Sequence, residues 1–438
     1  MLPKFSTAAL AFAAIAIATD APKVTFTKDV LPVLQAHCQT CHRPGQAGPM
    51  SFLTYESARP WAAAMKEAVR LRKMPPWFAA PGSGHFLNDP SLKQSEIDLI
   101  AKWADSGAPQ GNPKDAPPAI QWPKGWHIQP DVVVEGPTYE VDAKPKNNVI
   151  EWAIVTIPTG FAKDTWITSV EIKPEHADVT HHMCVAFVPH KEGVKYFEPR
   201  WNAKQRDDDG AALPDKGKTF TGGAAEDCYV PGNPAIDFRP LNAAKLVPAG
   251  YDIEMNLHYT PNGKAVTDHI KIGFTLAKQP PQRRYLSLGA SSPRDPKLFA
   301  IPAGDPNWKS PPGEVVFGQD VELVFMLPHM HARGKDMTYT LEFPDGRKQV
   351  ILDVPKYDFN WQLGYQTSVK IPKGTKLRVD AHFDNSPNNA SNPNPQKTVY
   401  YGEMTWEEMM LGFFSVVVDP NADTKTIIVK QAGPAGGA

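Results

Sequence analysis

The spacing of hydrophobic positions changes about a quarter of the way along the chain. In VTFTKDVLPVLQAHC (24–38) and PSLKQSEIDLIAKWADSG (90–107), apolar residues recur every three or four positions, which predicts amphipathic helices. We expect the second helix to be capped by Ser91 or Ser95 and to stop at Gly107. Beyond residue 130 short runs alternate between apolar and polar residues or are rich in β-branched ones, which predicts strands; examples are DVVVEGPTYEVDA, DTWITSVEIKP, YDIEMNLHY, DVELVFMLP, TKLRVDAHFDN and EMMLGFFSVVVD.

Turn residues separate these predicted strands. The motifs PNGK and PDGR lie between runs, and 45 prolines and 31 glycines suit short strands joined by many turns. The fold class that follows is multidomain: a small all-α domain, and then two all-β sandwich domains of the jelly-roll kind.

The predicted domains have clear boundaries in composition. A charged, then apolar, then small-residue segment at 1–18 predicts a signal peptide cleaved after Ala18, with an uncleaved anchor as the alternative. The helical domain spans 19–111, and a proline-rich linker spans 112–130, which its tryptophans suggest is packed on a neighbour. The sandwiches are expected at 131–285 and 286–425, with a flexible tail at 426–438.

Charge and hydropathy limit the partners. The chain has 438 residues and a net charge of -1, so it lacks the excess positive charge that is typical of proteins that bind nucleic acid. After signal cleavage no remaining stretch approaches the roughly 20 apolar residues of a membrane span. We therefore expect an exported protein, periplasmic or extracellular, in a compartment where thiols oxidise.

The four cysteines fall into two groups. Cys184 and Cys228 stand far apart, and because an exported chain rarely keeps free thiols we expect them to form a disulfide. Metal ligation by Cys184 is the alternative. Cys38 and Cys41 belong to HCQTCH, which contains the C-x-x-C-H signature of covalent haem c attachment with His42 as the iron ligand.

The surroundings of HCQTCH resemble a small class I cytochrome c domain. That family takes its sixth iron ligand from a methionine in the loop before the last helix, and RKMPPW offers Met74 at this place. A thioether ligand would raise the haem potential. His85, in the turn GSGHF, is the alternative ligand, and Met74 as a plain core residue is the structural alternative.

The segment LPHMHARGKD (327–336) contains a second candidate metal site. On a strand His329 and His331 would point the same way and Met330 the other, so the two imidazoles could share one metal ion. Taken alone, such a pair is also typical of a hydrogen-bonded surface pair.

Further histidine and methionine motifs occur in a fixed order around this pair. HHM comes first, then LHYTPNGK, then HMH, then EEMM, and this order resembles the copper type II, ascorbate-dependent monooxygenases over residues 130–420. The resemblance implies an electron-transfer copper held by His181, His182 and His258. It also implies an oxygen-binding copper held by the set of residues that would carry catalysis, His329, His331 and Met409. Imidazole suits both copper oxidation states, and a thioether favours Cu(I).

The chain departs from the peptide-hydroxylating relatives at three positions. Where those relatives hold the carboxylate of the substrate with arginine, asparagine and tyrosine, this sequence has Leu327, Leu411 and Phe413. The family's disulfide at this place is also missing, with Met410 and the region of His382 at the two positions. Because an apolar wall cannot balance a buried carboxylate, we expect a small, neutral, largely apolar substrate.

The sequence thus predicts an exported haem c and copper-dependent monooxygenase. It would use O2, two copper ions and a covalent haem. The haem would take electrons from a periplasmic donor and so replace ascorbate as the reductant. The alternative from another class is a non-catalytic redox or copper-binding electron-transfer protein. A third interpretation, a structural pair of sandwiches with haem as sole cofactor, requires the histidines to be dispersed in space.

Overall fold

The structure is a computed structural model that describes residues 23–46, 48–144, 153–201, 227–230 and 235–431. The predicted signal peptide, its cleavage site and the end of the predicted tail lie outside the described residues.

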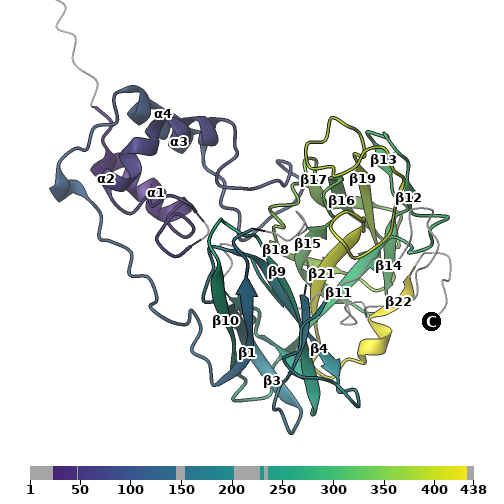
Figure 1. Ribbon diagram of the computed structural model, residues 1–438. Coiled ribbons are helices and arrows are strands. Elements are labelled where there is room, and N and C mark those ends of the chain that lie inside the picture. The colour runs from purple at the N-terminus through teal and green to yellow at the C-terminus, as the bar shows by residue number, and fades with distance from the viewer. Residues whose placement is uncertain (1–22, 47, 145–152, 202–226, 231–234, 432–438) are drawn as a thin grey trace, which may run out of the picture.

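Four α-helices form the N-terminal region, at the top left of Figure 1. They are α1 (Leu31–His37), α2 (Tyr55–Ala58), α3 (Ala62–Arg70) and α4 (Gln94–Asp105), with a π-helical turn at Phe26–Val30. Phe26, Leu34, Ile100 and Trp103 are buried together in a separate small core. This region is therefore held by its own apolar faces, as the periodicity predicts.

The start of α4 differs from the prediction. Neither Ser91 nor Ser95 caps the helix; the N-cap is Lys93, whose backbone N–H donates to Glu96 Oε2 at 2.7 Å. A glutamate three residues into the helix can satisfy the exposed amide without a serine cap. The helix does end before Gly107, which has φ +85.

The rest of the chain is mostly β structure, and its largest element is a nine-stranded sheet that runs through both halves. Its order is β1-β10-β3-β8-β11-β21-β15-β18, with β7 beside β3. The strands are β1 (Val132–Val141), β3 (Thr165–Lys173), β7 (Ile236–Asp237), β8 (Ala243–Val247), β10 (Val266–Leu276), β11 (Arg283–Ser291), β15 (Val321–His329), β18 (Tyr365–Ile371) and β21 (Leu411–Val418).

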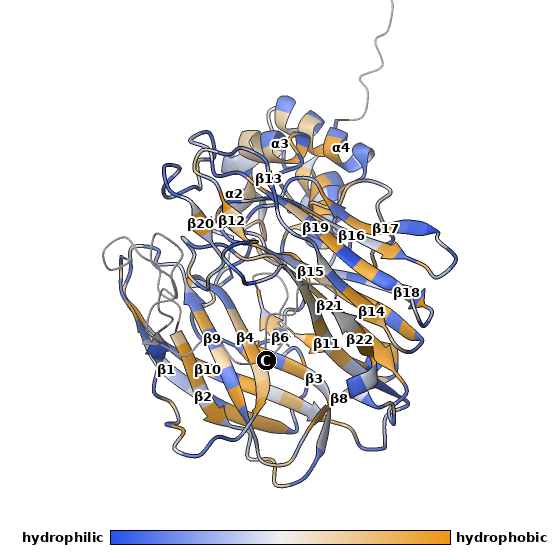
Figure 2. Ribbon diagram, turned by 90° about the vertical axis from the view of Figure 1, so that its right-hand side faces the viewer, coloured by the Kyte–Doolittle hydropathy of each residue, from blue (hydrophilic) through white to orange (hydrophobic). Residues whose placement is uncertain are grey.

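Two smaller sheets supply the facing layers. One has five strands: β2 (Ala153–Pro158), β4 (Thr180–Pro189), β5 (Arg200–Trp201), β6 (Asp227–Tyr229) and β9 (Tyr251–Tyr259). The other has six: β13 (Trp308–Lys309), β14 (Gly313–Phe317), β16 (Gly334–Glu342), β17 (Lys348–Val354), β19 (Lys376–Phe383) and β22 (Ile428–Gln431), and β12 (Ala300–Ile301) pairs with β20 (Val399–Tyr400). Each small sheet shares an apolar core with one half of the long sheet, and the loops around them are mostly hydrophilic (Figure 2).

The architecture is sandwich-like, but the predicted boundaries need correction. The boundary at 285/286 falls inside β11, which pairs with β8 of the first half and β21 of the second. The predicted start of the tail at 426 is also too early, because β22 pairs with β14. The two sandwiches are thus joined edge to edge through one continuous sheet.

The linker is packed on its neighbours. The guanidinium of Arg43 lies 4.0 Å from the ring centre of Trp122. Further along, the backbone N–H groups of His127 and Ile128 both donate to the carboxylate of Glu171 on β3. These contacts tie the helical region to the first sandwich.

A second connection reaches the other sandwich. Residues 77–88, which follow α3 and which we call the strap, lie against β17 and β18. Ala80 N–H donates to Asp353 O at 2.7 Å, and Leu87 N–H donates to Gln366 O at 2.8 Å. The helical region is therefore attached to both sandwiches.

Cys184 and Cys228 form the predicted disulfide, between the paired strands β4 and β6. This pairing excludes Cys184 as a metal ligand. Among the described residues no helix is long and apolar enough to cross a membrane. The disulfide is compatible with an exported protein.

Candidate functional site

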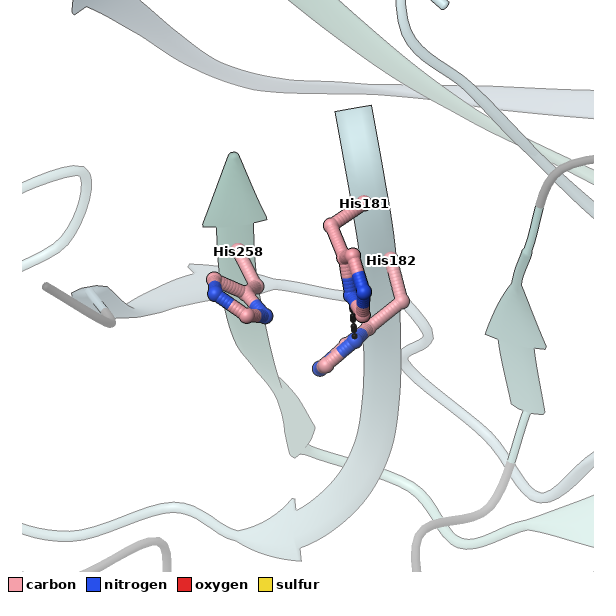
Figure 3. A group of neighbouring side chains, drawn as sticks. All are labelled: His181, His182 and His258. Carbon is pink, nitrogen blue, oxygen red and sulfur yellow. Dashed lines mark hydrogen bonds between the residues drawn. The ribbon is translucent and has the colours of Figure 1, made fainter. Parts of the chain in front are cut away.

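Three histidines meet on two paired strands of the five-stranded sheet (Figure 3). His181 and His182 lie at the start of β4, and His258 lies near the end of β9, directly opposite His182 in the antiparallel register. The register shifts between Thr180 and His182. Such an irregularity interrupts the alternation of faces, so two consecutive histidines can serve one site.

The geometry of this first cluster suits a metal ion. One nitrogen from each of the three rings can be chosen so that all lie within 4.8 Å of one another. His181 Nδ1 lies 3.0 Å from His182 Nδ1, whereas His181 Nε2 is buried and has no hydrogen-bond partner among the described residues. Buried polar atoms normally have a partner, so His181 Nε2 is a nitrogen to which a metal ion could bind.

All three histidines are held in the neutral form that binds metals. Burial lowers the pKa of His181 to about 4. Burial, followed by the charges of neighbouring histidines, lowers the pKa of His182 and His258 well below 6.5. The neighbours that act on His182 include His329 and His331, so the second histidine pair is close by.

The second cluster lies where β15 ends and β21 begins. His329 is the last residue of β15 and pairs in register with Leu411, the first residue of β21. The ring centres of His329 and His331 are 5.5 Å apart, and both side chains are buried. Met409 lies two residues before β21, and both Met409 and Met330 are buried in the same apolar core. Of the two, Met409 also borders the cavity described below.

Each ring of this pair is oriented by a bond from Nδ1. His329 Nδ1 lies 2.7 Å from Gln362 Oε1, and His331 Nδ1 lies 3.1 Å from the carbonyl oxygen of Glu407. Both acceptors require a proton on Nδ1, which makes Nε2 the nitrogen that a metal would take. Burial lowers the pKa of His329 to about 4 and that of His331 to about 3, so both are neutral at pH 7.

The glutamates of the EEMM motif fix the turn that carries His331. Glu408 is fully buried and accepts from the backbone N–H groups of His331 and Arg333 at 2.9 and 2.6 Å. Burial raises the pKa of Glu408 to about 8 in spite of the nearby Arg333. These bonds tie the EEMM segment, which contains Met409, to the turn that carries His331.

The loop between β17 and β18 (355–364) contacts both clusters. The Tyr357 hydroxyl bonds to the backbone N–H and carbonyl of Met330, at 3.1 and 2.7 Å. The Phe359 ring lies 5.7 Å from His181 and 6.3 Å from His331 between ring centres. Sequence reasoning missed Tyr357, Phe359 and Gln362, because an irregular loop has no periodicity that says where its side chains point.

A cavity of about 700 Å³ lies between the sandwiches and borders both clusters. His182 lines it on the side of the first cluster, and His329 and Met409 line it on the side of the second. Its wall includes the apolar residues Leu288, Phe325, Leu327, Leu411 and Phe413.

The charged residues at this wall are few. Asp237, Arg294 and Glu403 also border the cavity. Burial raises the pKa of Glu403, and the positive charge of Arg294 opposes this rise, so the last two charges lie near enough to compensate each other.

The C-x-x-C-H motif follows α1 in a tight turn. Cys41 and His42 N–H both bond to Cys38 O, and His42 Nδ1 lies 3.2 Å from Met50 O, which leaves Nε2 as the ligand nitrogen for an iron. Cys38 and Cys41 are unpaired thiols, and burial raises the pKa of both, to about 12 for Cys38. This direction is opposite to the lowered pKa of a redox-active C-x-x-C pair.

The two alternative iron ligands lie in different surroundings. Met74 stays with the helical region, where its backbone N–H contacts Ala68 O of α3 at 3.4 Å. The carbonyl of His85 accepts from Thr367 Oγ1 of β18 at 2.8 Å, which ties His85 to the second sandwich.

Three further histidines outside the clusters, His176, His190 and His382, have protein partners. His382 Nδ1 lies 2.6 Å from Asp336 Oδ1, and His190 Nδ1 lies 3.0 Å from Asp252 Oδ2. The backbone N–H of His176 donates to Asp268. Among the described residues, none of the three belongs to the cluster of His181, His182 and His258.

Comparison with known proteins gives no family. No family model matches the chain, and no curated protein matches it. A solved structure of infectious bursal disease virus, Gx strain, shares 8% identity, with 70% of this chain and 75% of that chain covered and a TM-score of 0.18. A Paenibacillus xanthan lyase also shares 8% identity, with 72% and 29% covered and a TM-score of 0.17. Similarity at this level carries no argument about function.

Proposed function

We propose that the protein is an exported, haem c and copper-dependent monooxygenase that hydroxylates a small, neutral, largely apolar molecule with O2. One observation carries the proposal: a single cavity is bordered by His182 of the first cluster and by His329 and Met409 of the second. A three-histidine site and a histidine–methionine site facing one cavity supply the donor sets of an electron-transfer and an oxygen-binding copper, as the sequence motifs imply.

The protein's own residues would prepare the reaction. When bound, copper would supply the one-electron and oxygen chemistry that protein side chains lack. Gln362 and Glu407 would keep the imidazoles of His329 and His331 aimed with Nε2 toward the ion. Met409 would supply a soft thioether, which favours Cu(I), the state that must meet oxygen.

The substrate class follows from the cavity wall. Leu327, Leu411 and Phe413 line the cavity beside Met409, at the positions where relatives place groups that bind a carboxylate. These side chains cannot offset the desolvation of a charge, but they favour apolar surface leaving water. The C–H bond to be hydroxylated would therefore belong to a neutral molecule.

Electrons would enter at the first cluster. Cys38, Cys41 and His42 would hold a haem, which would supply one-electron chemistry toward a periplasmic donor. Burial and then the charge of Cys41 raise the pKa of Tyr229, so the motif lies near this tyrosine of β6. Tyr229 pairs in register with Met183, the neighbour of His182, which supports a short route from haem to the first copper.

Substrate-dependent oxygen uptake tests the proposal. The copper-loaded, haem-reduced protein would be compared with Met409→Leu over a panel of neutral substrates. Met410→Leu is the matched control, because Met410 is buried next door in the core and outside the predicted ligand set. We expect uptake and hydroxylated product with wild type and the control, and a loss of at least about 100-fold with Met409→Leu, as for removal of a group that acts in the transition state. No substrate-dependent uptake by wild type across the panel would favour the redox carrier.

A further inference from the structure

We propose that the strap completes the substrate cavity and that Leu87, at its end, sets the size of the molecule that the cavity accepts. This inference rests on the proposed function for the identity of the cavity as the substrate site. It assigns part of that site to the N-terminal helical region, which the sequence motifs connect only with electron supply.

Bonds at Leu87 and at Asn88 fix the strap to β18 and to the residue before it. Leu87 N–H donates to Gln366 O at 2.8 Å. The next residue, Asn88, donates from its amide to Gly364 O and accepts from Gln366 N–H, both at 2.8 Å. The position of the Leu87 backbone is therefore determined by the second sandwich.

Aromatic packing holds the rest of the strap. The Tyr365 ring lies 4.7 Å from Trp77 and 5.4 Å from Phe86 between ring centres, and Trp77 and Phe86 are 5.6 Å apart. Such a three-ring cluster buries a large apolar area and resists displacement. The strap thus behaves as a part of the second sandwich in spite of its place in the sequence.

The Leu87 side chain borders the cavity and is unusually exposed. It is 61% accessible, although the backbone around it is tied down. Phe325 and Gly364 of the second sandwich line the same cavity. A fixed, exposed leucine on the rim of an apolar cavity would lose its contact with water when an apolar molecule enters, which adds to the affinity.

The strap also connects to a predicted metal ligand. Gly364, which accepts the bond from Asn88, lies two residues after Gln362, the partner of His329 Nδ1. The short stretch 362–366 therefore bonds both to the strap at Leu87 and Asn88 and to His329. Leu87 and His329 line the same cavity.

Binding of a neutral probe to the metal-free full-length protein tests the inference. The probe is N-phenyl-1-naphthylamine, whose fluorescence rises in apolar surroundings, and straight-chain primary alcohols of increasing length compete with it. Leu87→Ala and Leu87→Trp are compared with Leu71→Ala, a control leucine at the end of α3 that is 56% exposed and absent from the cavity lining.

We expect Leu87→Ala to weaken probe binding about tenfold, the effect of losing a few apolar contacts, and Leu71→Ala to leave it unchanged. Leu87→Trp should shift the preference among alcohols to shorter chains. Equal affinities for wild type and Leu87→Ala together with an unchanged alcohol preference in Leu87→Trp overturn the inference, as does a wild type that binds no probe.

The outcome is independent of oxygen chemistry, because the probe needs neither metal nor reductant. A protein that binds the probe through Leu87 but shows no Met409-dependent oxygen uptake would keep the strap as part of a binding site and lose the monooxygenase.

Discussion

The first histidine cluster stands on two hydrogen-bonded strands, whereas the second is assembled from a strand end, a loop and the segment before another strand. In the first, the register of β4 and β9 alone sets His182 opposite His258. In the second, Gln362 and Glu407 must each hold one imidazole, and Glu408 must hold the turn between them. The first site is therefore made rigid by the sheet, while the second depends on residues outside the sheets.

This difference suits a division of tasks. A site that only passes electrons gains from a fixed geometry, which keeps reorganisation small. In the proposed function the second site must admit oxygen and substrate, and it would do so from the cavity lined by Leu327 and Phe413.

Removal of one ligand from either cluster should have the largest effect. His182→Ala and His331→Ala should each reduce bound copper from two ions to one and lower substrate hydroxylation by at least about 100-fold. Copper would be counted per chain by elemental analysis after dialysis. Loss of both ions from either single variant would show that the two clusters are not separate sites.

Loss of the bond to His329 should distinguish the clusters. Gln362→Ala should weaken copper binding at the second cluster by about 10- to 100-fold and leave the first unchanged, because only His329 loses its orienting partner. Titration against a copper chelator measures both affinities. Gln349→Ala, at an exposed position of β17, is the control. An equal effect on both clusters would contradict the separation.

Substitution of Phe359 should affect both clusters, in contrast to substitution of Gln362. Because its ring contacts His181 and His331, Phe359→Ala should weaken copper binding at both clusters, each by about two- to tenfold, the cost of losing part of an aromatic contact. The same chelator titration applies. An effect confined to one cluster would mean that Phe359 belongs to that cluster alone.

The smallest effect concerns pH. Burial lowers the pKa of His181 and His329 to about 4 and of His331 to about 3, so protons should compete with copper only as the pH approaches these values. The metal-free protein should lose stability as the pH falls below 6.5, because the unfolded chain then binds protons that the buried histidines do not. Copper retention would be followed from pH 8 to pH 4, and release near 6.5 would contradict the burial of the ligands.

The sequence predicted the strands that carry the histidines more reliably than the sheet that joins them. YDIEMNLHY alternates clearly and forms β9. In contrast, RRYLSLGAS of β11 begins with two arginines and contains serines and a glycine, so it has no strong apolar alternation although it lies at the centre of the long sheet. The predicted boundary at 285/286 fell inside this strand for that reason.

From the sequence, only the candidate metal ligands of the site could be predicted, and not the residues that position them. The motifs HHM, LHY, HMH and EEMM name residues that the structure brings to two neighbouring clusters, but His181 serves the first cluster because of an irregular register that no local pattern shows. Gln362 and Phe359 lie in a loop without periodicity, and Leu87 comes from another region of the chain. Their positions result from tertiary packing, which a single sequence does not display.

X-ray absorption at the copper edge of the reduced, copper-loaded protein reports the ligand atoms of both copper ions. We expect a sulfur ligand on one of the two ions in wild type and in Met410→Leu, and only nitrogen and oxygen ligands in Met409→Leu. A sulfur ligand that persists in Met409→Leu, or its absence from wild type, would contradict this expectation.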